Sequence, residues 1–261
     1  MGTRNSCGTR YERQAWRAGR QRVAGVDEVG RGALFGPVLA AAVILDPKDC
    51  IRGLQDSKRL SPQQRERLAA EIRRRAMAWA VASVDAAEID RINIYQASRR
   101  AMRQAVLELD PPPDLLLVDA LRLDLSIAQV SLIRGDARSV SIAAASILAK
   151  VERDALMREW DRRFPQYQLA NNKGYPTPIH RAMLRELGPT PLHRLSYAPV
   201  AAAMAHPSLV SRNPGLPFPD GGEEIPGSEI QTTPLGPRRG NISPATDLSE
   251  KQTLPSAPNG R

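Results

Sequence analysis

Apolar runs alternate with amphipathic segments between about residues 22 and 205 of the chain. Short continuous apolar runs predict strands, whereas apolar residues spaced three and four apart predict helices. The predicted strands are residues 23–29, 37–45, 78–84, 115–118 and 127–133. The predicted helices are one opening at Ser61 with Pro62 in its first turn, a short one capped by Asp85, residues 94–109, residues 139–164, and two shorter ones after it. This mixture predicts an α/β fold in which helices cover both faces of one sheet.

The two ends of the chain differ in composition from this middle part. Residues 1–21 carry five arginines and no clear apolar period, which predicts a flexible basic N-terminal arm. Residues 206–261 interleave proline with glycine and serine. Such a segment buries too little apolar surface to offset the entropy of ordering, so we expect a disordered tail. The folded domain is therefore expected at residues 22–205.

Charge narrows the range of partners. The 261 residues include 37 Lys and Arg against 28 Asp and Glu, which gives a net charge of +9. A chain this basic attracts polyanions, and nucleic acid is the leading candidate. The two cysteines, Cys7 and Cys50, form neither a disulfide framework nor a metal motif, so we expect a reducing, cytoplasmic setting. The longest apolar run, residues 38–45, is too short to span a bilayer. We also expect the protein to be a monomer.

Four carboxylates stand in or shortly after predicted strands, where burying an unpaired charge costs free energy. Asp27 and Glu28 interrupt the first predicted strand, Asp119 ends the fourth, and Asp136 follows the fifth. Strand ends gather along the edge of an open α/β sheet, so these acids are expected to converge. Four converging anions need cations, and hard oxygen ligands suit Mg²⁺ or Mn²⁺. Two such ions can clamp a phosphodiester during hydrolysis.

Each of these acids alone has an ordinary alternative role, in a cap, a strand end or a glycine turn. Neighbours on a strand also face opposite ways, so Asp27 and Glu28 cannot both reach one ion from an ideal strand. A distorted strand end or a contact through a backbone carbonyl would be needed.

Glycines follow the acidic pair after Val29, as Gly30-Arg31-Gly32 with Gly36 further on. The spacing is one residue too long for a dinucleotide-binding loop, and a strand rather than a helix follows. Glycines also let the backbone approach a nucleic-acid strand closely, where a 2′-hydroxyl separates RNA from DNA. A plain turn between two strands remains the alternative.

The string Ala24-Gly25-Val26-Asp27-Glu28-Val29-Gly30-Arg31-Gly32 resembles the signature of the type 2 ribonuclease H family, ribonuclease HII. Other elements similar to that family are residues 56–60 (DSKRL), 117–120 (LVDA), 134–137 (RGDA), 144–151 (AASILAKV) and 173–177 (KGYPT), with His180, His193, Arg194 and Ser196. The resemblance covers about residues 22–205 and neither tail.

The resemblance implies an RNase H-like fold: a mixed five-stranded sheet flanked by helices, with a helical C-terminal extension. It also implies an endonuclease that hydrolyses the RNA strand of RNA–DNA hybrids and cuts 5′ of ribonucleotides in duplex DNA, leaving 3′-hydroxyl and 5′-phosphate ends. By motif, the metal-binding catalytic acids would be Asp27, Glu28, Asp119 and Asp136. The substrate-binding residues would be Gly30, Arg31 and Gly32 at the ribose, Tyr175 stacking at the RNA–DNA junction, and Ser57, Lys58 and Lys173.

Three residues depart from the family pattern in segments expected to face the substrate. Asn172 stands where a histidine is usual, Leu195 replaces a common arginine, and Arg134 replaces a lysine. His180 and His193 are expected to be structural. Two alternative functions stay open: a non-catalytic basic nucleic-acid-binding protein, and another metal-dependent nuclease of the same fold.

Overall fold

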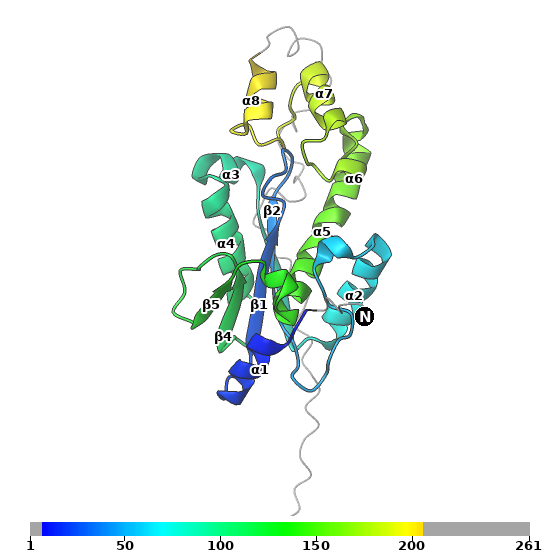
Figure 1. Ribbon diagram of the computed structural model, residues 1–261. Coiled ribbons are helices and arrows are strands. Elements are labelled where there is room, and N and C mark those ends of the chain that lie inside the picture. The colour runs from blue at the N-terminus through cyan, green and yellow to red at the C-terminus, as the bar shows by residue number, and fades with distance from the viewer. Residues whose placement is uncertain (1–6, 206–261) are drawn as a thin grey trace, which may run out of the picture.

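A computed structural model describes residues 7–205 of the chain (Figure 1). Its centre is a five-stranded sheet in the order β3-β2-β1-β4-β5. The strands are β1 (Val23–Val29), β2 (Val38–Ile44), β3 (Ala78–Val84), β4 (Leu115–Asp119) and β5 (Gln129–Leu132). The pairs β1–β2 and β2–β3 are antiparallel, whereas β1–β4 and β4–β5 are parallel. The predicted mixed five-stranded sheet is therefore confirmed.

Several helices begin at residues whose side chains cap them. They are α1 (Arg10–Arg17), α2 (Pro62–Arg75), α3 (Ala86–Ile92), α4 (Ile94–Leu107), α5 (Val140–Arg163), α6 (Leu169–Asn172), α7 (Pro178–Leu187) and α8 (Ala198–Met204). Ser61 and Gln64 form a reciprocal capping box at α2. The side chains of Asp85 and Ser139 cap α3 and α5. Each cap satisfies a backbone N–H that would otherwise lack a partner.

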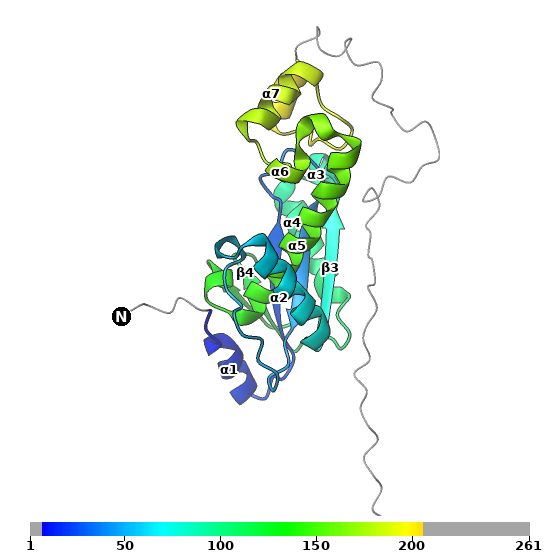
Figure 2. The ribbon, with the colours of Figure 1, turned by 90° about the vertical axis from the view of Figure 1, so that its right-hand side faces the viewer.

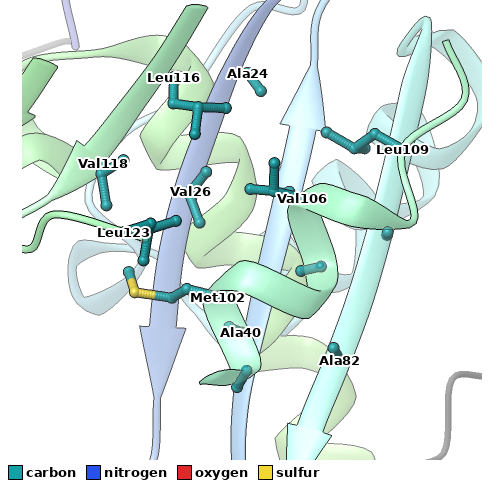
Figure 3. Packing of buried hydrophobic residues seen from close by; sticks show 14 of the residues in the cluster. Ala24, Val26, Ala40, Ala82, Met102, Val106, Leu109, Leu116, Val118 and Leu123 are labelled. Carbon is teal, nitrogen blue, oxygen red and sulfur yellow. The ribbon is translucent and has the colours of Figure 1, made fainter. Parts of the chain in front are cut away.

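The two faces of the sheet are covered by different helices. Figure 3 shows α4 crossing one face, where Met102 and Val106 pack against alternate residues of the strands, including Val26 and Val118. The opposite face carries α5, which packs on β1 and β2 together with α2. Because side chains alternate along a strand, odd-numbered residues of β1 face α5 and even-numbered residues face α4.

Helix α5 lies unusually close to β1. A Cβ added at Gly25 would stand 2.0 Å from the carbonyl carbon of Ser141 and 2.2 Å from its oxygen. The first turn of α5 thus rests directly on the backbone of β1, which places the N-terminus of α5 beside the strand that carries Asp27 and Glu28.

Helices α6 to α8 form the predicted extension beyond one end of the sheet, whereas α1 lies at the opposite end (Figures 1 and 2). The core of the C-terminal extension includes Phe35, Trp160 and Tyr167. Two buried histidines, His180 and His193, face each other with 3.1 Å between their Nε2 atoms. Burial lowers the pKa of both rings, so each is held neutral. This arrangement fits the structural role expected of them.

The structure differs from the prediction for the N-terminal arm. Residues 10–17 form the helix α1, and Glu12 and Ala15 on one side of it are buried against the domain. Ala15 packs with Val23 of β1 and Leu115 of β4. The prediction missed α1 because only these two positions are fully buried, whereas Arg10, Arg13, Gln14 and Arg17 are exposed. The predicted tail, residues 206–261, lies outside the described residues.

Among residues 7–205, no helix is both long enough and apolar enough to cross a membrane.

We expect Gly25→Ala to destabilise the protein by about 3 kcal/mol or more, because its methyl group would meet the α5 backbone and not a movable side chain. Urea denaturation of the purified variant measures this. Gly32→Ala is the matched control, since a Cβ there meets nothing within 4 Å. Equal unfolding midpoints for the two variants would contradict the packing described.

We expect stability to fall as the pH drops below about 6.5, the pKa of an unfolded histidine. Below that pH the unfolded chain binds protons that the buried His180 and His193 do not bind, so stability falls with pH, by at most about 1.4 kcal/mol per pH unit for each histidine. Urea midpoints between pH 7.5 and 5.5 measure the slope. His180→Gln with His193→Gln should flatten it. A flat profile in the unmodified protein would refute the assignment.

Candidate active site

Asp27 and Asp119 lie at the carboxyl ends of two neighbouring parallel strands. The register of β1 and β4 pairs Val26 with Val118, so the two aspartates are each one residue beyond that pair. Leu117 belongs to the core on the α5 side, and alternation places Asp119 and Asp27 on that same side. The sheet therefore brings together two acids that are 92 positions apart in the sequence.

Asp27 occupies the most buried position of the group, with 6 % of its surface exposed. Burial raises its pKa well above the ordinary value, and the charges of Glu28 and Asp119 raise it further. The Ser146 hydroxyl and the Glu28 backbone N–H, which donates to Asp27 Oδ1 at 2.8 Å, oppose that rise. Ser146 lies 3.0 Å from Ser57 through their hydroxyl oxygens. Ser57, predicted as a substrate contact, is thus buried beneath the site.

Glu28 is half-buried at the end of β1 and, as expected from alternation, leaves the strand on the other face. Its Oε1 accepts from Arg31 Nη1 at 3.3 Å, and its Oε2 is buried without a hydrogen-bond partner among the described residues. Burial raises the pKa of Glu28, Arg31 lowers it, and Asp119 raises it. An orphaned carboxylate oxygen beside two further acids is an incomplete arrangement unless a cation joins it.

Asp136 enters from the loop after β5. Gly135 precedes it, and the Gly135 N–H donates to Asp119 Oδ1 at 2.7 Å, which ties this loop to the end of β4. Burial raises the pKa of Asp136, the charges of Asp56 and Asp119 raise it further, and Lys58 lowers it. The charge of Asp119 therefore acts on each of the other three predicted acids.

The donor set fits a hard divalent cation, although the side chains do not yet form a coordination shell. No three Asp, Glu, His or Cys side chains of residues 7–205 are grouped tightly enough to hold one ion as positioned. Yet burial and neighbouring carboxylates raise the pKa values of Asp27, Glu28 and Asp136, and Arg31 and Lys58 offset only part of that rise at Glu28 and Asp136. Carboxylate oxygens in this state are typical ligands of Mg²⁺ or Mn²⁺, which would remove the repulsion.

The glycine loop after β1 is held by two buried arginines that have no carboxylate partner among residues 7–205. Arg194 donates from Nη1 to the Arg31 carbonyl at 2.8 Å and from Nε to the Gly36 carbonyl at 3.0 Å. Tyr197 donates its hydroxyl to the same Arg31 carbonyl at 2.6 Å. Arg153, from α5, donates to the Phe35 carbonyl at 3.0 Å. The C-terminal extension thus fixes the path of the loop.

The two glycines among the loop residues predicted to contact ribose differ in their surroundings. Gly30 has a φ of +92°, and a Cβ there would meet the Arg153 guanidinium at 2.6 Å, so glycine is required for packing. A Cβ at Gly32 would meet nothing within 4 Å. Gly32 therefore lacks a packing reason within the described residues, which leaves room for the close approach of a ligand.

A second loop, residues 173–177, lies against the glycine loop. The Leu34 N–H donates to the Gly174 carbonyl at 2.7 Å, and Arg153 Nη2 donates to the Lys173 carbonyl at 3.3 Å. Asn172 closes this loop by accepting from the Gly174 N–H at 2.8 Å and donating to the Tyr167 carbonyl. The structure thereby joins the segments of Arg31 and Tyr175, as the substrate predictions require.

The sequence analysis did not single out Ser146 and Arg153 and left Arg194 without a role. Arg153 had a detectable signal, because it falls on the apolar stripe of α5 between Ala149 and Met157. A charged residue on such a stripe must find polar partners in the interior, and here those partners are loop carbonyls.

Comparison with known proteins identifies the family. A sequence model described as Ribonuclease HII matches residues 24–200. Ribonuclease HII of Koribacter versatilis (strain Ellin345) is 58 % identical over 202 residues, which cover 77 % of this chain and 80 % of that protein. Ribonuclease HII of Geobacillus kaustophilus (strain HTA426) is 56 % identical over 192 residues, covering 73 % of this chain and 74 % of that protein.

Solved structures show the same architecture. The crystal structure of ribonuclease H2 from Pyrococcus horikoshii OT3 has a TM-score of 0.64 at 26 % identity and covers 70 % of this chain and 97 % of that one. RNase HII from Archaeoglobus fulgidus, solved as a complex with PCNA, has a TM-score of 0.55 at 28 % identity and covers 63 % of this chain and 85 % of that one. Family model, relatives and fold agree, and this chain belongs to the ribonuclease HII family.

Proposed function

We propose that this protein is an endoribonuclease that hydrolyses the RNA strand of RNA–DNA hybrids and cuts 5′ of ribonucleotides embedded in duplex DNA, leaving 3′-hydroxyl and 5′-phosphate ends. The observation that carries this proposal is that Asp27 lies beside Asp119 on the α5 side of two adjacent parallel strands. Burial and the charges of the neighbouring acids raise the pKa of Asp27 there. A non-catalytic binder of polyanions would gain nothing from such a group, since uncompensated carboxylates repel phosphate.

Asp27, Glu28, Asp119 and Asp136 would hold Mg²⁺ or Mn²⁺ through their carboxylate oxygens. A distant relative, the RNase HIII named Bst-RNase HIII, was crystallised with Mn²⁺. Bound divalent ions would supply an activated water and neutralise charge at the scissile phosphate. The chain itself fixes the acids: Ser146 and Ser57 lie beneath Asp27, the Gly135 N–H orients Asp119, and Arg31 orients Glu28.

Selection of the ribonucleotide would fall to the two joined loops. Gly32 offers exposed backbone with free space where a side chain would stand, so its polar groups can meet a 2′-hydroxyl. Tyr175 is half-buried in the neighbouring loop and would stack on the sugar or base at the RNA–DNA junction. Lys58, exposed near Asp136, and Lys173 would contact backbone phosphates. We place the protein in the cytoplasm as a monomer.

A panel of labelled duplexes tests the proposal: all-DNA, RNA–DNA hybrid, and DNA with one ribonucleotide, each with Mg²⁺, Mn²⁺ or EDTA. We expect cutting of the last two substrates only, at a single position 5′ of the lone ribonucleotide, and none in EDTA. Cutting of all-DNA would favour a different nuclease of this fold. Binding without cutting under every condition would favour the non-catalytic alternative.

We expect Asp27→Asn and Asp119→Asn each to reduce single-turnover cleavage by roughly 10³-fold or more, as for residues that act as one catalytic unit. Each substitution removes a charged oxygen donor while keeping side-chain volume, so duplex binding should survive. Asp124→Asn is the matched control, because Asp124 is exposed on a loop after β4. Near-normal rates in either site variant would remove that residue from the catalytic group.

A further inference from the structure

Helix α1 is anchored to the segment that carries the fourth acid. The buried Glu12 carboxylate accepts from the Ser139 hydroxyl at 2.5 Å and from the Ser141 N–H at 3.1 Å, both at the start of α5. Just before the helix, Cys7 Sγ donates to the carbonyl of Asp136 at 2.6 Å. These contacts fix α1 relative to the active-site edge of the domain, although it lies outside the part that the family model matches.

The opposite side of α1 presents arginines to solvent. Arg10, Arg13 and Arg17 are exposed and stand at positions i, i+3 and i+7, which share one face of a helix. With Gln14 they line a shallow recess. No carboxylate of residues 7–205 lies within 4.0 Å of their guanidinium groups, whereas several other arginines, such as Arg22 with Asp114 and Arg75 with Asp49, are paired. The charge of this row is thus available to an external anion.

The shape of this row suits the backbone of a nucleic acid. At 1.5 Å per residue the three arginines extend over about 10 Å of helix, and duplex DNA carries one charge per about 1.7 Å of its axis. Guanidinium groups bind phosphate in a bidentate manner. In both views α1 lies at the end of the molecule away from α6 to α8, whose loop carries Tyr175 (Figures 1 and 2).

We propose that Arg10, Arg13 and Arg17 form a phosphate-binding surface that grips the duplex outside the stretch held between the acids and the Tyr175 loop. This inference rests on the proposed function, because it takes the duplex at the four acids as its starting point. The surface would add affinity without reading sequence, since phosphate contacts position a protein but do not specify bases.

The test measures binding of ribonucleotide-containing DNA duplexes by fluorescence anisotropy over a range of salt concentrations. The full-length chain with Asp27→Asn, which prevents cutting, serves as the parent. One duplex has about 10 base pairs, a single helical turn, centred on the ribonucleotide, and the other about 30. Adding Arg10→Gln, Arg13→Gln and Arg17→Gln should weaken binding of the long duplex and reduce its salt slope by about 2 to 3, because each phosphate contact contributes about 0.9. Binding of the short duplex should not change.

A control variant, Arg99→Gln with Arg103→Gln and Arg122→Gln, removes the same charge from the α4 side of the sheet. Arg99 and Arg103 donate to backbone carbonyls there and pair with no carboxylate of residues 7–205. This control should keep the parent's salt slope. An unchanged slope in the α1 variant, an equal loss in the control, or an equal loss on the short duplex would each overturn the inference. Cleavage of the long duplex by the unmodified chain, measured in parallel, tests the proposed function separately.

Discussion

The parallel pairing of β1 with β4 is the constraint on which the site depends. It places two carboxylates at the same level on the α5 side of the sheet, in a position where burial raises the pKa of Asp27. Such an arrangement opposes folding unless something compensates it, because like charges in a poorly solvated site repel strongly. The surrounding structure supplies part of that compensation through hydroxyl and N–H groups at Ser146 and Gly135. A divalent cation would supply the rest.

A second layer of organisation comes from buried arginines that bind carbonyls in place of carboxylates. Arg153 and Arg194 are completely buried, and their hydrogen bonds join the glycine loop, the Tyr175 loop and the C-terminal extension. Burying a guanidinium group costs free energy unless its N–H groups are hydrogen-bonded. When one guanidinium donates to several backbone carbonyls, it also fixes the positions of those carbonyls relative to one another. The extension is therefore part of the site, since it shapes the loop that follows the acids.

The N-terminal helix extends the same principle to the other end of the domain. Glu12 is a buried acid whose partners are the first residues of α5, so that α1, α5 and the Asp136 loop are held together. One side of α1 is thus buried against the domain, and the other presents exposed arginines that pair with no carboxylate in the part of the chain that the structure describes. A helix of eight residues is too short to be stable by itself, so the tertiary contacts of α1 are what stabilise it.

The sequence by itself determined the strands, the long helices, their caps and the family, because apolar periodicity, capping residues and an acidic Gly-Arg-Gly string are local signals. It also singled out the four acids and predicted that they converge, and the parallel pairing of β1 with β4 places Asp27 beside Asp119. Only the tertiary structure decided that Ser57 lies buried beneath Asp27, that Gly30 is required by Arg153, and that α1 is a helix. Each of these depends on contacts between residues far apart in the chain. Local patterns report what a residue can do, whereas burial and partners are set by the residues that the fold places beside it.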